Sequence, residues 1–406
     1  MQSLRNYLDR IKPNFQKGGR FEHLESVFDG FETFLYTPRT AAARIGAQIH
    51  DALDSKRIMI IVVLALMPCL LFGMYNTGYQ NALAAGVQPD AIAFWPTFLY
   101  GLLAVLPRII VAYAVGLGIE FAVAQMRHEE IQEGFLVTGI LIPLICPIET
   151  PLWMLAVATA FSVIFVKEVF GGTGYNVFNV ALVTRAFLFF AYPAQMSGDK
   201  VFVASQKIFG LGYDLPNGFT GATPLGQIAT FAGDKLEVLN LQDRAISTWD
   251  AFLGLIPGSM GETSTLCVLI GAVLLLATGI ASWRIIVSVV AGGLVMGAIA
   301  HALPTATYPA SFLTPLDQLL YGGFAFAAVF MATDPVTAAR TGTGKYVYGF
   351  IVGAVAILIR VYNNGYPEGA MLAVLLGNAL APLIDWCVVQ ANVSRRMARM
   401  KKRVNP

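Results

Sequence analysis

Long apolar runs separated by short polar stretches dominate the chain and predict a bundle of membrane-spanning helices. Each run is close to the length of about 20 residues that a helix needs to cross a bilayer. The runs lie at 57–76, 95–126, 134–148, 150–170, 176–195, 263–283, 285–304, 316–332, 345–363 and 369–390. We therefore expect an all-α polytopic membrane protein with about ten transmembrane helices and a long polar loop in its middle.

Prolines indicate where these helices break. The second run contains Pro107-Arg108, and the short third run contains Pro143 and Pro147. Broken or short helices are stable in a membrane only where protein or water satisfies the freed backbone groups, and in transporters they mark binding sites. We expect an interruption of the second run at Pro107 and a short third helix.

The two halves of the chain repeat similar motifs in the same order. Glu133-Gly134-Phe135 and Gly322-Gly323-Phe324 each open a short run, and Gly174-Tyr175-Asn176 and Gly365-Tyr366-Pro367 each precede a later helix. An odd number of spans in each half gives the two halves opposite orientations in the membrane. This pattern predicts two inverted five-helix repeats. Ordinary loop composition is the alternative, because glycine and proline punctuate any membrane loop.

The predicted organisation has five parts. They are an N-terminal segment at 1–56, a first five-helix repeat at 57–195, a polar loop at 196–262, a second repeat at 263–390 and a basic tail at 391–406. Lysine and arginine are concentrated in the first and last parts, which places both ends of the chain in the cytoplasm. The polar loop then faces outward.

Composition agrees with a membrane location. Hydrophobic residues make up 56% of the chain and charged residues only 13%, whereas soluble proteins carry about 25% charged residues. The four cysteines lie in apolar runs without a Cys-x-x-Cys pair, so we expect no metal site in this chain.

The polar loop contains the motif Thr220-Gly221-Ala222-Thr223-Pro224, which is followed by a helix-like run. The order of residues predicts Thr223 as the N-cap and Pro224 as the first helical residue. A phosphate esterified to Thr223 lies at the positive end of that helix. An ordinary capped turn fits the same pattern, because short motifs often match by accident.

Two asparagines are candidate ligands of a flavin ring. Asn176 and Asn179 are spaced three apart, which places them on one face of the expected fifth helix. A flavin needs a dry pocket and a few donors to its ring. The alternative is that both side chains cap the start of the helix and bind backbone groups.

Ionisable residues inside membrane runs are costly unless they are paired or hydrated. Glu368 and Asp385 lie at opposite ends of the tenth run, as the two mouths of an ion path require. Pairing with Arg360 and the C-terminal arginines is the alternative. Phe326 and Phe330 in the eighth run are candidates for an aromatic gate that closes the path by excluding water. Phenylalanine is also common in membrane helices for packing alone.

Several motifs, in the same order, resemble the B subunit of sodium-translocating NADH:quinone oxidoreductases, and the resemblance covers essentially the whole chain. Besides the threonine motif they are Lys167-Glu168-Val169-Phe170-Gly171-Gly172-Thr173-Gly174, Arg185-Ala186-Phe187-Leu188-Phe189-Phe190-Ala191-Tyr192-Pro193 and Thr333-Asp334-Pro335-Val336-Thr337. The chain departs from the family pattern at Asn217, where an acidic residue is common, and at Val180, where proline is expected.

The resemblance implies that electrons from NADH pass through FMN, bound covalently to Thr223 by a phosphoester, and then through riboflavin to ubiquinone. It implies coupled export of a cation, with sodium expected. The implied partners are the other subunits of the complex and a flavin transferase that attaches the FMN. The implied location is the bacterial inner membrane, and no nucleic-acid partner is expected.

Two other functions remain open from the sequence. The D subunit of the Rnf electron-transport complex shares the expected fold and the flavin-bearing threonine, but it lacks the N-terminal extension. A flavin-free ion channel with the same inverted repeats is the alternative from another class of protein. A flavin that stays bound after denaturation separates the redox functions from the channel.

Overall fold

The computed structural model describes residues 2–15, 18–21, 28, 32, 55–127, 134–196, 201–216, 219–231, 237–363 and 365–404. Across these residues the regular structure is helical, with three isolated β-bridges and no strand. The predicted all-α class is confirmed. Asn217 and most of the predicted N-terminal segment lie outside the described residues.

Five of the described helices are long and apolar enough to cross a membrane. They are α3 (Ser55–Ala84), α4 (Phe94–Arg127), α11 (Trp283–Ala302), α14 (Gly342–Tyr362) and α15 (Ala370–Val404). These helices support a membrane protein. The number of ten spans and the inverted arrangement of the two halves stay predictions.

Shorter elements lie between the long helices. They are α1 (Gln2–Ile11), η1 (Lys12–Asn14), η3 (Pro89–Ala91), α5 (Phe135–Ile145), α6 (Leu152–Ser162), η4 (Val163–Glu168), α7 (Val180–Ala191), η5 (Pro193–Gln195), α8 (Pro224–Ala229), α9 (Thr248–Leu253), α10 (Thr265–Ala277), η6 (Pro309–Phe312), α12 (Pro315–Leu320), α13 (Phe324–Phe326) and η7 (Ala327–Met331). Two of them, η4 and η7, are π-helical turns. Such turns are often found at functional sites.

The expected break at Pro107 was wrong, because α4 runs through this proline as one helix. Proline leaves a carbonyl of the preceding turn without its helical partner. The side chain of Arg108 donates a hydrogen bond of 2.7 Å to the carbonyl of Ala104, one turn earlier. The carbonyl that Pro107 leaves without its helical partner is that of Leu103, so this contact lies beside the defect, and α4 continues through it.

The eighth predicted run is divided instead. Its first part is α12, the chain then turns at residues 321–323, and its second part is the helical segment of α13 and η7. Gly322 has a φ of +68°, a conformation that side chains rarely adopt. This break matters for function because Gly322 lies against Leu225, two residues after Thr223.

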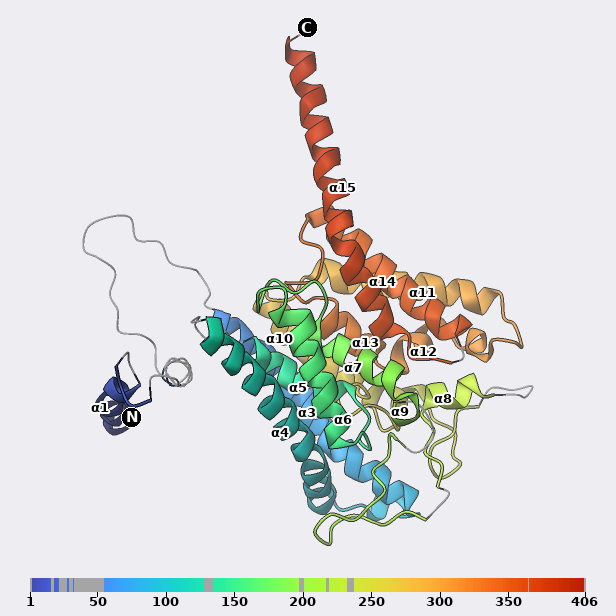
Figure 1. Cartoon of the computed structure of the whole chain (residues 1–406). Coiled ribbons are helices and arrows are strands. Elements are labelled where there is room, and N and C mark those ends of the chain that lie inside the picture. The colour runs from blue at the N-terminus through green and yellow to red at the C-terminus, as the bar shows by residue number, and fades with distance from the viewer. Residues whose placement is uncertain are drawn as a thin grey trace.

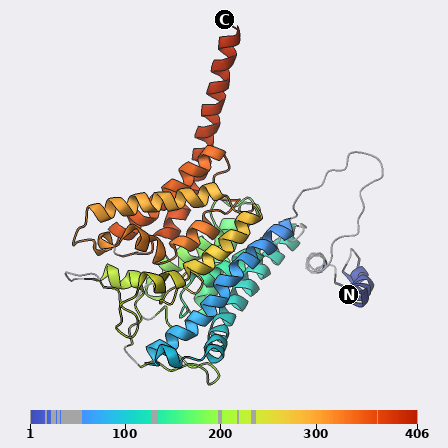
Figure 2. The ribbon, with the colours of Figure 1, turned by 180° about the vertical axis from the view of Figure 1, so that it is seen from behind.

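Close backbone contact holds the long helices together. Helices α3 and α4 lie side by side, and α11 packs along α14 (Figures 1 and 2). A Cβ at Gly353 of α14 would lie 1.9 Å from the carbonyl oxygen of Val289 in α11, and a Cβ at Gly292 would lie 2.3 Å from that of Phe350. Small residues at such contacts let membrane helices approach closely.

The last helix, α15, begins inside the bundle and extends beyond it (Figure 1). The first part of α15 packs against α14 and α7, whereas its C-terminal part projects past the other helices (Figure 1). Exposed basic residues, among them Arg395, Arg396 and Arg399, lie on the projecting part. The short helices α8 and α9 lie at the opposite end of the bundle from this projection (Figure 1).

Candidate functional site

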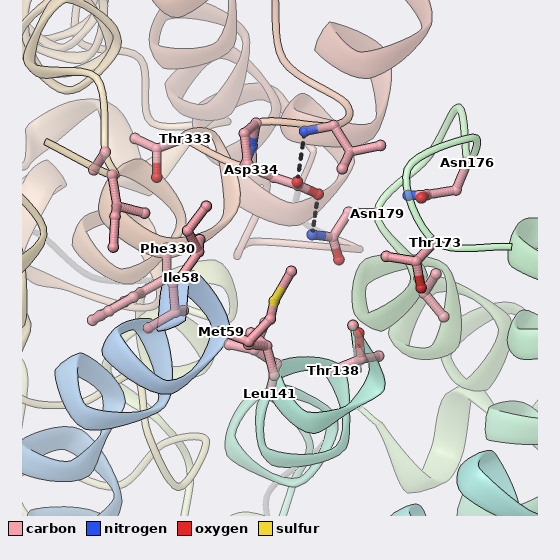
Figure 3. A pocket seen from close by; sticks show the side chains of 18 of the residues that line it. Ile58, Met59, Thr138, Leu141, Thr173, Asn176, Asn179, Phe330, Thr333 and Asp334 are labelled. Carbon is pink, nitrogen blue, oxygen red and sulfur yellow. Dashed lines mark hydrogen bonds between the residues drawn. The ribbon is translucent and has the colours of Figure 1, made fainter. Parts of the chain in front are cut away.

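A cavity of about 120 Å³ lies between the two halves of the bundle, and we call it the Asn179 cavity. Its polar lining includes Thr138, Lys167, Asn176, Asn179 and Asp334. Figure 3 shows side chains from both halves of the chain around it, with Asn179 and Asp334 joined by a hydrogen bond. Apolar side chains, among them Met59, Leu141 and Phe330, close the remaining walls.

Both candidate asparagines line this cavity, but the predicted position on one helical face was wrong. Helix α7 begins at Val180, so Asn176 and Asn179 both precede it. Asn179 is the N-cap, and its side-chain oxygen accepts a hydrogen bond from the Leu182 N–H. The Asn176 amide donates to the carbonyl of Phe178. The three-residue spacing is typical of a helix, whereas the preceding glycines let the chain turn before the helix begins.

Asp334 is held in place at the cavity wall by several donors. It accepts hydrogen bonds from the Asn179 amide at 3.1 Å, the Val336 N–H at 3.0 Å and the Thr337 hydroxyl at 3.1 Å. Burial raises the pKa of this carboxyl, and the same hydrogen bonds oppose that shift. Asn179 comes from the first half of the chain and Asp334 from the second, so this contact joins the halves at the cavity.

A buried ion pair stands next to the same cavity. Lys167, on the π-helical turn η4, pairs with Glu120 of α4. Both side chains are almost fully buried, and the ammonium lies 5.9 Å from the centre of the Phe135 ring. A buried charge is stable only when it is paired, and the pair leaves Lys167 at the cavity edge.

Thr223 occupies the position that the sequence predicted. It is the N-cap of α8, with Pro224 as the first helical residue, and its Oγ1 accepts a hydrogen bond of 3.1 Å from the Gly226 N–H. Within the motif Thr220 is exposed, Gly221 is buried and Ala222 is half-buried. The Thr223 side chain is half-buried at the edge of a second cavity.

This second cavity, which we call the Thr223 cavity, has a volume of about 20 Å³. Besides Thr223 it is lined by Gly258, Ser259, Glu262 and Glu368. Two carboxylates from distant parts of the chain therefore share one small space with the threonine that the resemblance marks for flavin attachment.

Arg185 of α7 pairs with both carboxylates. Its guanidinium forms ion pairs with Glu262, at 3.4 Å, and with Glu368. Burial raises the pKa of the Glu262 carboxyl, and the Arg185 guanidinium opposes this shift. Within the described residues the buried Nε of Arg185 has no hydrogen-bond partner. We call Arg185, Glu262 and Glu368 the buried charge cluster.

Arginines also donate hydrogen bonds to backbone carbonyls near the ends of two short helices close to this cluster. Arg185 donates to the carbonyl of Ile145, the last residue of α5, and Arg360 of α14 donates to that of Gln318 in α12. Arg360 also donates to the backbone carbonyl of Glu368 at 3.4 Å. A helix that ends inside a membrane protein needs donors for its last carbonyls. The arginines supply these donors.

The remaining predicted residues, Phe326, Phe330 and Asp385, lie away from the Thr223 cavity. Phe326 and Phe330 are both buried, with ring centres 4.9 Å apart, and Phe330 lines the Asn179 cavity. Asp385 lies within α15, 17 residues beyond Glu368, which corresponds to about 25 Å along a helix. Its carboxylate accepts hydrogen bonds from the Arg340 and Thr341 N–H groups and caps the approach to α14.

Sequence reasoning missed Glu262 and the role of Lys167. Glu262 stands at the end of the predicted polar loop, directly before an apolar run, where a carboxylate is ordinarily exposed to water. The signal was present in the small residues around it, Gly258-Ser259 and Gly261, which let the loop approach the bundle closely. The alternative pairing of Glu368 with the Arg360 side chain was also wrong, because the Glu368 carboxylate pairs with Arg185.

These observations define a polytopic membrane protein with a threonine at a buried charge cluster and a second polar cavity between its halves. The sequence pattern of the NQR2, RnfD, RnfE family matches residues 43–394. The chain therefore belongs to this family.

Relatives resemble the chain over nearly its whole length. The B subunit of the Na(+)-translocating NADH-quinone reductase of Azotobacter vinelandii is 44% identical, over 98% of this chain and 99% of the relative. The proteins of the same name from Pseudomonas aeruginosa and Chromohalobacter salexigens are each 43% identical, over 98% of this chain and over 99% and 96% of the relative, respectively.

Proposed function

We propose that the chain is the B-type membrane subunit of a sodium-translocating NADH:ubiquinone reductase. In this proposal it carries FMN covalently on Thr223 and holds riboflavin in the Asn179 cavity. It passes electrons from NADH towards ubiquinone, coupled to sodium export across the bacterial inner membrane. The full-length similarity to proteins of that name supports the membership of such a complex.

The observation that carries the proposal is the place of Thr223. Its side chain lies half-buried at the N-cap of a short helix and at the edge of a cavity lined by the buried charge cluster. A phosphoester at this oxygen keeps the cap geometry, because the Gly226 N–H meets the same oxygen atom. The flavin supplies electron-transfer chemistry when bound, and the chain supplies attachment, orientation and charge.

The composition of the Asn179 cavity supports a second flavin at this place. The cavity has a volume of about 120 Å³, with Lys167, paired with Glu120, at one side and amides at another. Ligand sites combine mostly apolar walls with a few fixed polar groups. Asn179 and Asp334 are fixed by their mutual hydrogen bond, so their polar atoms are pre-oriented towards a ligand.

The proposed ion path keeps Phe326 and Phe330 as the gate and Glu368 and Asp385 as its two mouths. Tightly packed aromatic side chains exclude water, and their displacement opens a pathway. The buried, closely packed pair of rings supports a closed gate. The relatives are reductase subunits, which favours this function over a D-type subunit of an Rnf complex or a flavin-free channel.

In-gel flavin fluorescence after denaturation tests the attachment site. We expect the wild-type chain to fluoresce, Thr223→Val to lose the signal and Thr223→Ser to retain it, because serine keeps the acceptor hydroxyl. Thr230→Val, at the other end of α8, is the matched control and keeps the fluorescence. A wild-type chain without covalent flavin, or a fluorescent Thr223→Val variant, contradicts the proposal.

A further inference from the structure

The break between α12 and α13 is in contact with the Thr223 site from two directions. Leu225, two residues after Thr223 and buried, lies so close to Gly322 that a Cβ there would be 2.6 Å from the leucine Cδ1. Glu262 lies so close to Gly323 that a Cβ there would be 2.8 Å from its carboxyl carbon. Only glycine fits at either position without displacing these side chains.

The segment that begins at this break ends at the other cavity. Gly323 is the residue before α13, and the helical segment continues through Phe326 and η7 to Met331. Phe330, Thr333 and Asp334 then line the Asn179 cavity. From Gly323 to Asp334 is 11 residues, or about 16 Å along a helix. One short rigid segment therefore connects the two proposed flavin sites.

The buried charge cluster lies beside the start of this segment, because Glu262 faces Gly323. Glu262 is almost fully buried and faces Arg185 from α7, Ser259 from its own loop and Gly323 from the break. Glu368 and Tyr366 stand around the same group. Among the described residues, Arg185 is the cation that pairs with both glutamates. A negative charge added next to the cluster competes with both carboxylates for this one guanidinium, and charges interact strongly away from water.

We infer that Glu262 is a positioning residue that transmits the charge of a flavin on Thr223 to the helical segment 324–331, and so to the gate residues and the Asn179 cavity. This inference rests on the proposed function. Negative charge added at Thr223 by reduction of a flavin bound there would draw the Arg185 guanidinium away from Glu262. The carboxylate then shifts at Gly323, and the segment moves with it. No bond is made or broken in this step.

Hydrogen exchange of the purified complex, followed by mass spectrometry, tests the inference. The peptide covering 323–334 is compared between the air-oxidised and the dithionite-reduced states. In the wild type we expect exchange of this peptide to differ between the two states by more than the scatter of replicate measurements. In Glu262→Gln, which keeps the shape of the side chain, we expect the difference to vanish.

Glu149→Gln is the matched control, because Glu149 is a half-buried carboxylate on the loop side that accepts hydrogen bonds from Ser205 and does not line the Thr223 cavity. This variant keeps the redox-dependent difference. A purely structural role of Glu262 predicts instead that Glu262→Gln exchanges faster in both states by the same factor, which overturns the inference.

The outcomes also separate the inference from the proposed function. A chain with covalent flavin whose peptide 323–334 exchanges equally in both states overturns the inference and leaves the flavin site standing. A chain without covalent flavin overturns both. Should Glu262→Gln fail to fold, the wild-type comparison and Gly323→Ala decide, since the added Cβ displaces the Glu262 carboxyl and we expect it to reduce the difference.

Discussion

At the scale of single residues, the polar groups that matter sit where the chain changes from loop to helix. Thr223 caps α8 and Asn179 caps α7, and each lines a cavity as well. A capping side chain is fixed by its own backbone hydrogen bond, so it presents its remaining polar atoms in a constant direction. Both proposed flavin contacts therefore come from pre-oriented groups.

Substitution of Asn179 by serine separates its two roles. Serine is an equally good N-cap, so α7 keeps its start, but the amide that donates to Asp334 is lost. Asp334 then has one donor fewer at the cavity wall, and we expect the variant to retain less non-covalent flavin than the wild type. The measurement is non-covalent flavin released from the purified chain on denaturation.

Asn240→Ser is the control for that experiment. Asn240 organises a turn in the loop by accepting hydrogen bonds from the Gln242 and Arg244 N–H groups, and it lines neither cavity. We expect its flavin content to equal that of the wild type. An unchanged amount of released flavin in Asn179→Ser shows that this asparagine serves only as a helix cap.

At the scale of elements, glycine contacts decide how closely the long helices approach. Gly353 of α14 touches the backbone of α11, and we expect Gly353→Ala to force the two helices apart. Overpacking of this kind costs about 1–3 kcal/mol. Thermal unfolding in detergent measures the loss, with Gly118→Ala in α4 as the control.

Gly118 is the matched position because no heavy atom lies within 4 Å of a Cβ built there. Its replacement by alanine leaves the unfolding temperature unchanged or slightly raised, since alanine favours the helix. Equal unfolding temperatures for Gly353→Ala and the wild type contradict the close contact between α11 and α14.

Apolar length was enough to predict the all-α class and the five long helices, and local rules were enough for the cap at Thr223. The continuation of α4 through Pro107 was not predictable from the sequence pattern, because proline usually interrupts a helix. The buried charge cluster was not predictable either. Its members are separated by up to 183 residues, and only folding brings Arg185 to Glu368.

At the scale of the whole molecule, two proposed flavin sites stand at either end of one short segment. If the polar loop faces outward, electrons from cytoplasmic NADH cross the membrane to Thr223 and return for reduction of the quinone. Such a round trip brings a negative charge past the gate residues in every cycle. In the proposed function the topology of the chain is therefore part of the coupling, and it has a direct test.

Labelling with a membrane-impermeant maleimide tests that topology. Cys387→Ser removes the exposed native cysteine, and single cysteines are then placed at Lys207 in the polar loop or at Arg396 in the projecting part of α15. Both side chains are exposed. With the loop outward and the tail cytoplasmic, Lys207→Cys reacts in intact spheroplasts, whereas Arg396→Cys reacts only after lysis. Reaction of both from the same side contradicts opposite placement of the loop and the tail. Reaction of Lys207→Cys only after lysis contradicts the need for electrons to cross the membrane to reach Thr223.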